Sequence, residues 1–285
     1  MDNVFLFEFD IDGKFLSIYC GMLEGNYFAY AFFDGKSASR TFLKGECRLF
    51  KYQFQALENF FTPDRLKFSL YGEIGINCDV RISQNSGVIS NRGLGNILPR
   101  NVRVEFISEF SEFFGEVAIN GNVHHIKSMG HIHRISARKI PDKFYALNLL
   151  GENVSLASYM GNNAIWMYNF NSFLTAGTIA REDYRFTDYN FSTISVSDNG
   201  NHLMIKLNKG KTELILCAEC AHEQFLKFNG RIIRANNYTK ADILLRIGNK
   251  DVFKDRVSAT LLINGKLKVG KYAESSNLCE ASALN

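Results

Sequence analysis

The stretch VFLFEFDIDGKFLSIYCG, residues 4–21, predicts two β-strands joined by a tight turn. Apolar side chains recur at every second position on both sides of Asp12-Gly13, and a period of two is that of a strand. Asp and Gly tolerate the positive φ that both central positions of a two-residue hairpin turn require. We therefore expect an antiparallel hairpin at the beginning of the chain.

Similar turn sequences recur along the rest of the chain. Further turn sequences separate short runs of Phe, Ile, Val, Leu and Tyr: Asn120-Gly121, Asn199-Gly200, Asn208-Lys209-Gly210, Asn229-Gly230 and Asn264-Gly265. Helical periodicity is scarce. The best candidate is YQFQALENFFTPD, residues 52–64, where Phe54, Leu57 and Phe61 fall near one helical face and Pro63 would end it. A strand that runs into a loop fits this segment equally well. The pattern predicts an all-β, antiparallel protein with little helix.

The length of 285 residues accommodates roughly 15 to 20 strands of average length. The interior of one small barrel is already filled at about eight strands, so two barrels fit the chain better. The weakest point of the strand pattern is GLGNILPRNV, residues 93–102. We expect a first barrel over residues 1–115 and a second over residues 116–285.

Composition excludes several classes of function. The net charge is only +4, from 33 basic and 29 acidic residues that are interspersed, and this argues against nucleic-acid binding. No signal peptide and no apolar run near the ~20 residues of a membrane helix is visible, so we expect a cytoplasmic protein without an integral membrane segment. Walker, HExxH and nucleophile-elbow motifs are missing, and no cofactor is expected.

The six cysteines show no framework spacing, and we expect all of them to be reduced thiols. Cys217 and Cys220 form a CxxC, but it lies within an apparent strand, which puts the two side chains on opposite faces. A redox CxxC sits at a helix N-terminus instead, and no second CxxC completes a zinc site. We expect these two cysteines to be structural.

Four of the six histidines fall within INGNVHHIKSMGHIHRIS, residues 119–136. Period-two alternation puts His131 and His133 on one face of a strand, and Gly130 before them is a candidate β-bulge. A metal site would need His202 or His222 as a further ligand, because no glutamate follows the HxH; we expect no metal. His124 and His125 flank a predicted turn, where solvent exposure is expected.

Acidic and aromatic residues supply further candidates. Glu116 belongs to VEFISEFSEFFGEV, residues 104–117, whose phenylalanines would raise the pKa of an enclosed acid; an exposed row of acids backed by buried phenylalanines is the alternative. Asp183 and Tyr184 form a second group in REDYRFTDYNF, residues 181–191. In AIWMYNFN, residues 164–171, three aromatic side chains alternate and can form one wall of a site.

The segment GEVAINGNVHHIKSMGHIHRI, residues 115–135, followed by AIWMYNFN, resembles the carotenoid 1,2-hydratase and AttH-like double-lipocalin family. Lipocalin-like Diels–Alderases and tocopherol-cyclase-like proteins have a related architecture. The resemblance implies two lipocalin-like barrels packed together, with an apolar pocket for a polyene or isoprenoid. Relatives of this kind protonate an alkene, hydrate it or fold a linear chain into a ring, without a redox cofactor.

From these observations we expect a cyclase, isomerase or hydratase that acts on an apolar polyene or terpenoid in specialised metabolism. A carrier of a lipid or pigment and a His-ligated metalloenzyme are the alternatives. We expect His131 and His133 to point into the second barrel or the seam between the barrels. The expected catalytic residues are His131, His133, Glu116, Asp183 and Tyr184. The expected substrate-binding residues are Trp166, Tyr168, Phe170, Phe114 and Met129.

Overall fold

The protein is described by a computed structural model. The structure describes residues 2–23, 25–84, 89–90, 102–137, 141–165, 168–220, 224–228 and 231–269. Apart from one 3-10 turn, η1 (Lys44–Glu46), the secondary structure of these residues consists of β-strands alone, and all of the strand pairs are antiparallel. The expected all-β class is confirmed.

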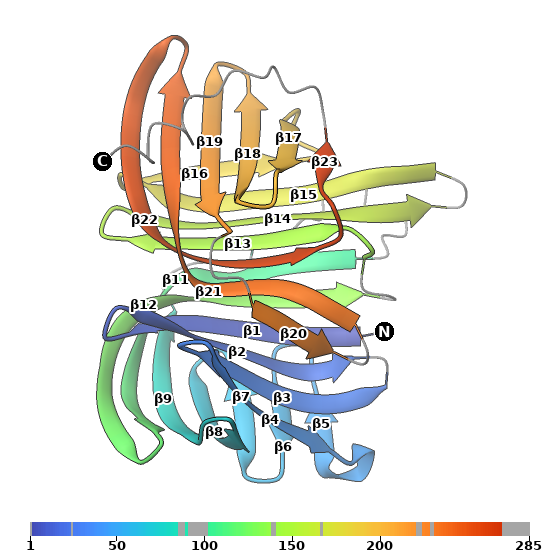
Figure 1. Ribbon diagram of the computed structural model, residues 1–285, viewed down its shortest axis with the longest axis vertical. Helices are drawn as coiled ribbons and strands as arrows, with labels where there is room; N and C mark the ends of the chain where they lie inside the picture. Colours follow the sequence, from blue (N-terminus) through green and yellow to red (C-terminus); the bar gives the residue numbers. More distant parts are fainter. Residues whose placement is uncertain are drawn as a thin grey trace. The chain divides into compact units, whose positions relative to one another are not determined.

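The first sheet contains a closed ring of strands (Figure 1). Its strands are β1 (Asp2–Ile11), β2 (Lys14–Leu23), β3 (Asn26–Phe33), β4 (Lys36–Phe42), β5 (Cys47–Leu49), β6 (Phe54–Ala56), β7 (Asn59–Thr62), β8 (Arg65–Gly72), β9 (Ile76–Gln84), β10 (Ile89–Ser90), β11 (Val102–Ile119) and β12 (Asn122–Ala137). The hydrogen-bonded order β11-β12-β1-β2-β3-β4-β8-β9 returns to β11, so these strands close a barrel. The seam between β4 and β8 is short, because only Ala38 and Ser39 find partners on β8.

Phenylalanines fill the interior of this barrel. Phe9 of β1 stacks on Phe113 of β11 with ring centroids 4.6 Å apart. The ring centroid of Phe61 in β7 lies 5.6 Å from that of Phe68 in β8 and 5.7 Å from that of Phe54 in β6. These rings belong to one buried cluster that includes side chains from strands on all sides of the barrel. The alternation in residues 4–21 thus points one set of side chains into a packed core.

The second sheet is a long antiparallel sheet that curls on itself. Its strands are β13 (Phe144–Gly151), β14 (Val154–Ile165), β15 (Tyr168–Ile179), β16 (Glu182–Thr187), β17 (Thr193–Asp198), β18 (His202–Lys209), β19 (Thr212–Glu219), β20 (Gln224–Phe228), β21 (Arg231–Ile247), β22 (Lys250–Asn264) and β23 (Lys268–Val269). The order β16-β15-β14-β13-β22-β21-β19-β18-β17-β23 leaves β16 and β23 at the ends. Lys209 of β18 donates a hydrogen bond to the carbonyl oxygen of Arg185 in β16 at 3.3 Å. The curled sheet encloses its own buried apolar cluster, to which Phe186 of β16 and Leu207 of β18 both belong.

The boundary between the two compact units differs from the expected one. The first unit includes the chain from Asn101 to Ile140, and the second includes the chain from Pro141 onwards. A boundary at 115/116 would instead cut through β11. The β11–β12 hairpin stays with the first unit because β12 pairs with β1 and β11 pairs with β9. The turn at Asn120-Gly121 marks this hairpin, but nothing local indicates the sheet to which the hairpin belongs.

Most expected turns are present, and the candidate helix is not. Asp12-Gly13 and Asn120-Gly121 have positive φ at both positions, as a two-residue hairpin turn requires. In the candidate helical segment, residues 52–64, a turn with Leu57 at φ 53° joins β6 to β7. The periodicity was ambiguous because Phe54 and Phe61 point inward from two paired strands as well as they would from one helix. None of the described residues forms a helix that is long and apolar enough to cross a membrane.

Candidate functional site

His131 and His133 lie on the outer face of the first barrel. The face that β12 turns to the barrel interior carries Ile132, which is part of the core cluster, so its neighbours in the chain point the other way. Both histidine side chains are nevertheless buried, at 1% and 4% exposure. Their rings lie 5.6 Å apart between centroids. The shared face that the sequence predicts is present in the structure.

Gly130 allows this part of β12 to approach its neighbours closely. A Cβ atom at this position would lie 2.1 Å from the carbonyl oxygen of Glu8 and 2.7 Å from the ring of Phe113. The expected bulge at Gly130 is wrong, because β1 pairs with β12 in continuous register from Asp2 to Phe9. The irregularity lies in β11, whose register against β12 shifts between Phe106 and Ser111. The glycine is therefore needed for space, and it leaves the parity of His131 and His133 unchanged.

Glu8 of β1 is the direct cross-strand partner of His131. Its carboxylate is buried, at 1% exposure, and its Oε1 accepts a hydrogen bond of 3.0 Å from the hydroxyl of Ser17 in β2. Sequence reasoning missed Glu8 as a site residue. The turn at Asp12-Gly13 already fixes the partnership of Glu8 with Ser17, but nothing local indicates that β12 pairs on the other side of β1.

Tyr19 continues the row of polar side chains along β2. It is a cross-strand partner of Leu6, which is in turn the partner of His133. Burial raises the pKa of the Tyr19 hydroxyl well above its ordinary value, and the negative charge of Glu8 raises it further. The hydroxyl is therefore protonated at all ordinary pH values and can donate a hydrogen bond.

His133 lies against the ring of Phe106, with centroids 4.5 Å apart. Burial lowers the pKa of its imidazole well below the ordinary value, and the neighbouring His131 lowers it further. The ring is therefore neutral near pH 7 and offers one N–H donor and one lone pair. We call Glu8, Ser17, Tyr19, His131 and His133 the buried polar cluster. They come from the adjacent strands β12, β1 and β2, and their side chains lie on the outer face of the first barrel. The cluster thus contains a carboxyl group, two imidazoles and two hydroxyls.

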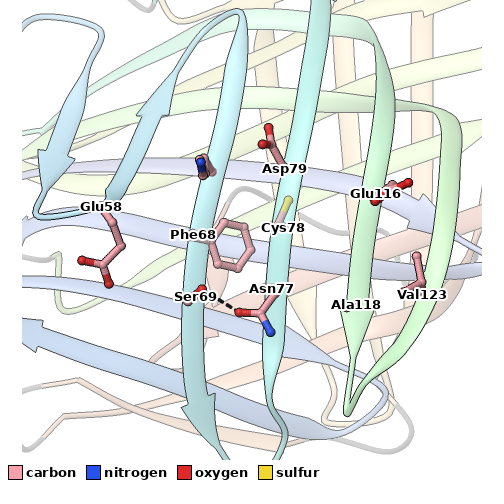
Figure 2. Close-up of a pocket in the computed structure, with 10 residues that line it drawn as sticks. Glu58, Phe68, Ser69, Asn77, Cys78, Asp79, Glu116, Ala118 and Val123 are labelled. Carbon is pink, nitrogen blue, oxygen red and sulfur yellow. Dashed lines mark hydrogen bonds between the residues drawn. The ribbon is translucent and has the colours of Figure 1, made fainter.

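Glu116 is not part of this cluster. It lies towards the other end of β11, its side chain is 63% exposed, and its nearest charged partner is His125 at 3.5 Å, which is itself 81% exposed. Figure 2 shows Glu116 at the edge of a surface depression of about 250 Å³ that Asp79, Asn77 and Val123 also line. The phenylalanines around Glu116 in the sequence do not enclose its carboxylate.

Among the acids of residues 104–117 whose side chains are described, Glu105 is the most deeply buried. It lies on the interior face of the first barrel, where its Oε2 accepts a hydrogen bond of 2.8 Å from Arg134 and its Oε1 pairs with Arg103. Arg134 also donates to the side-chain oxygen of Asn3 at 2.8 Å. Glu105 is thus an ion-pair partner, separate from the buried polar cluster.

The structure does not bring the remaining described candidates to the cluster. The side chain of Phe114 on β11 is 39% exposed. The side chain of Met129 on β12 is half-buried, and Met129 lies opposite Glu112. Asp183 accepts a hydrogen bond from Thr178 and belongs to β16 of the second sheet.

Tyr184 and His124 have partners of their own. The Tyr184 hydroxyl donates to Glu182 at 2.8 Å, and burial raises its pKa to about 12. His124 is only partly exposed and lies 2.8 Å from a carboxylate oxygen of Asp12.

The expected aromatic wall falls outside what the structure describes. Trp166 is not among the described residues, and of Tyr168 and Phe170 only the backbone in β15 is described. Their role in binding a substrate stays a prediction. Within the described part of the chain, no set of three or more His, Cys, Asp or Glu side chains is arranged to hold a metal ion.

The expectation that all six cysteines are reduced is wrong for Cys217, which is disulfide-bonded. Cys20, Cys47, Cys78 and Cys220 are free thiols, so the bond does not join the two cysteines of the CxxC. Cys220 belongs to the core cluster of the second sheet, and Cys217 does not, as expected for side chains on opposite faces of a strand. Spacing in the sequence could not reveal the pairing because a disulfide joins residues that the fold brings together.

No protein-family model and no curated protein sequence matches this chain. Solved structures that share its fold include the following three. A protein assigned as AttH from Nitrosomonas europaea is 9% identical with a TM-score of 0.56, over 93% of this chain and 92% of the other. Kievitone hydratase from Nectria haematococca is 9% identical with a TM-score of 0.54, over 93% and 89% of the two chains. CghA in complex with Sch210972 is 7% identical with a TM-score of 0.53, over 95% and 90%.

These matches extend over nearly the whole of each chain, at an identity too low to align individual residues. They confirm the expected architecture of two antiparallel, barrel-shaped sheets. The chain therefore has the fold of the AttH-like, lipocalin-like double-barrel proteins.

Proposed function

We propose that the protein is a cofactor-independent acid–base enzyme that hydrates, cyclises or isomerises an apolar polyene or terpenoid of specialised metabolism. The observation that carries the proposal is the buried polar cluster, five polar side chains on one face of three adjacent strands. Polar groups removed from water cost free energy that a purely structural sheet avoids by using apolar residues. Buried titratable groups with shifted pKa values are typical of functional sites.

The cluster contains the groups that addition of water to an alkene requires. An acid must give a proton to one carbon, and a base must accept a proton from the water that attacks the other carbon. Glu8 and its cross-strand partner His131 can hold and pass on the proton that is delivered. His133, which is neutral, can accept the proton of the water, while the Tyr19 hydroxyl donates a hydrogen bond. One proton is given and one is taken, so the net change is the addition of one water molecule.

The shared fold supports this chemistry in a general way. One protein with this fold is named a hydratase, and addition of water is the simplest reaction that the buried polar cluster can perform. Cyclisation or isomerisation would use the same proton donor without the water. No residue correspondence follows from an identity of 9%.

The packing of the first barrel favours an enzyme over a carrier. A carrier of the lipocalin kind holds its ligand inside the barrel, but the interior here is crossed by stacked and tilted phenylalanine rings. The polar cluster, by contrast, lies on the outer face of the same strands. Its position is the one expected of groups that act on a substrate held outside the first barrel.

Incubation in D₂O with the apolar metabolite fraction of the producing organism tests the proposal. Protonation of carbon by the enzyme places deuterium in a stable C–H position, and mass spectrometry detects a product that keeps the extra mass after return to H₂O. We expect the wild-type protein to form such a product and His131→Ala to form little of it. His125→Ala, which changes an exposed histidine of the same strand, should behave as the wild type. A compound that is bound and released unchanged by the wild type would instead establish a carrier.

A further inference from the structure

Residues 43–58 of the first sheet expose three large apolar side chains. Leu43 is 73% exposed, Phe50 is 55% exposed and Leu57 is 44% exposed. The segment comprises η1, β5 and β6 with their connections, drawn in blue at the end of the first sheet (Figure 1). Single exposed apolar residues are common on protein surfaces, but three within one segment of 16 residues call for an explanation.

The segment has an inner and an outer side. Phe54 and Ala56 are fully buried, and Leu49 and Tyr52 pack against the core of the barrel. The hydrogen bond from the amide of Phe50 to the carbonyl of Gln53, at 2.8 Å, closes the turn between β5 and β6. The inner side chains fix the segment on the barrel, so the outer apolar side chains are held in place rather than left on a loose loop.

Leu57 has a backbone conformation that is unfavourable for a leucine. Its φ is 53°, in the left-handed region that Gly, Asn and Asp occupy most easily. A glycine or asparagine would form the turn between β6 and β7 with less strain. An exposed leucine at such a position is consistent with a role for its side chain in a contact outside the barrel.

Basic residues outnumber acidic residues in the segment by three to two. Lys44, Arg48 and Lys51 are exposed, and none of the three forms an ion pair with a residue that the structure describes. The acids of the segment are already engaged, because Glu46 accepts a hydrogen bond from the amide of Leu43 and Glu58 pairs with Arg40 at 2.6 Å. Lys51 also places its ammonium over the Tyr52 ring, 4.8 Å from the centroid. Three cations without an ion-pair partner among the described residues therefore lie in the same segment as the exposed apolar side chains.

Protection of a sheet edge accounts for only part of this pattern. β5 ends the hydrogen-bonded order of the first sheet, with β6 as its one partner among the described strands. Cations on an edge strand discourage pairing with other molecules, which would explain Arg48 and Lys51. Exposed leucine and phenylalanine have the opposite effect, so edge protection leaves the apolar residues unexplained.

We propose that residues 43–58 dock the protein on an anionic membrane surface. Apolar side chains interspersed with Lys and Arg are the composition that binds the interface of a bilayer, the apolar groups entering the acyl boundary and the cations meeting anionic headgroups. Leu43, Phe50 and Leu57 are the inserting side chains, and Lys44, Arg48 and Lys51 contact the lipid phosphates and carboxylates. The inference does not depend on the chemistry proposed above.

Co-sedimentation of the full-length protein with lipid vesicles tests this inference. We expect binding to phosphatidylcholine vesicles that contain about a third phosphatidylserine, and weaker binding to phosphatidylcholine alone. Phe50→Ser should weaken binding to the mixed vesicles roughly tenfold, since it removes most of one inserted aromatic side chain. Lys51→Glu should abolish most of the difference between the two kinds of vesicle.

Two further variants keep the test specific. Val252→Ser removes a similarly exposed apolar side chain of β22 in the second sheet and should bind as the wild type does. Phe191→Ser tests a fully exposed phenylalanine of the second sheet. A thermal unfolding midpoint equal to that of the wild type shows that a variant is folded. Failure of the wild type to bind either vesicle, full binding by Phe50→Ser, or a loss of binding in Phe191→Ser alone would overturn the inference, as would concentration-dependent self-association that Phe50→Ser removes without vesicles.

Discussion

Glu8 and His131 are direct cross-strand partners in the pair β1·β12, and the side chains of both are buried. Side chains at directly facing positions of antiparallel strands are neighbours on one face of the sheet, so a carboxylate and an imidazole are brought together there. The relationship joins the beginning of the chain to the histidine-rich hairpin, two segments that are far apart in the sequence.

Loss of either cluster histidine should reduce turnover while leaving the protein folded. A positioned acid–base group typically contributes 10²–10⁴-fold in rate, so His131→Ala and His133→Ala should each lower kcat by about that factor on the substrate found in the D₂O experiment. Circular dichroism and thermal unfolding check the fold. His124→Ala, which changes a histidine near the β11–β12 turn, should have little effect on kcat. Full activity in both cluster variants would refute the site.

His133 should make the stability of the protein depend on pH. Its pKa is lowered in the folded protein, so the unfolded chain binds a proton more readily below its ordinary pKa of about 6.5. The free energy of unfolding should be constant above that pH with respect to this group and fall by up to about 1.4 kcal/mol per pH unit below it. Urea titrations at neutral pH and near pH 5.5 measure the difference.

The matched variant for this measurement is His133→Gln, which keeps a polar side chain of similar size without a titration in this range. It should show a smaller loss of stability between the two pH values than the wild type does. An identical loss of stability in both proteins would mean that the pKa of His133 is the same in the folded and unfolded states. The argument that burial lowers this pKa would then fail.

The sequence predicts the parts of this fold that depend on neighbouring residues, and it does not predict pairings between strands that are far apart in the chain. The turn at Asp12-Gly13 specifies its own hairpin, and with it the partnership of Glu8 and Ser17. The shared face of His131 and His133 follows from the period of a strand. The pairing of β1 with β12 has no local signal, because it depends on the closure of the whole barrel. Glu8 was therefore not predictable as part of the site.

Residues 52–64 show the same limit at short range. A helix and a two-stranded hairpin can both point Phe54 and Phe61 towards one core, and the turn at Leu57 lacks the glycine or asparagine that would have marked it. The role of Gly130 was hidden for a related reason. A missing Cβ allows a bulge or a close approach, and only the position of Glu8 and Phe113 distinguishes the two.

Gly130→Ala should destabilise the protein. Its new Cβ would meet the carbonyl oxygen of Glu8 and the Phe113 ring at distances that require the strands to shift. Overpacking of this kind costs about 1–3 kcal/mol of the free energy of unfolding, which urea denaturation measures. Gly45→Ala is the control, since its Cβ would have no atom within 4 Å. Equal stability of the two variants would contradict the close packing of β12 on β1.

The disulfide of Cys217 should be visible in a thiol count. Denatured without reductant, the protein should show two fewer reactive thiols than after reduction, because each disulfide consumes two. Cys220→Ser should remove one thiol and leave the difference of two unchanged, since Cys220 is free. A difference of zero in the wild type would show that Cys217 is reduced. A difference that disappears in Cys220→Ser would show that the CxxC itself is the bonded pair.

The ion pair of Arg134 with Glu105 should contribute far more to stability than an exposed pair of similar geometry. Glu105 is buried inside the first barrel, and the largely enclosed Arg134 lies 2.8 Å from it. Arg134→Leu leaves this buried carboxylate with less compensation and should cost about 3 kcal/mol. Arg65 and Asp79 form a pair at 2.9 Å whose side chains are both nearly half exposed, and water replaces the lost partner when Arg65 is changed to Leu. Urea denaturation of the two variants compares them directly. If Arg65→Leu is as destabilised as Arg134→Leu, burial is not what makes the interior pair strong.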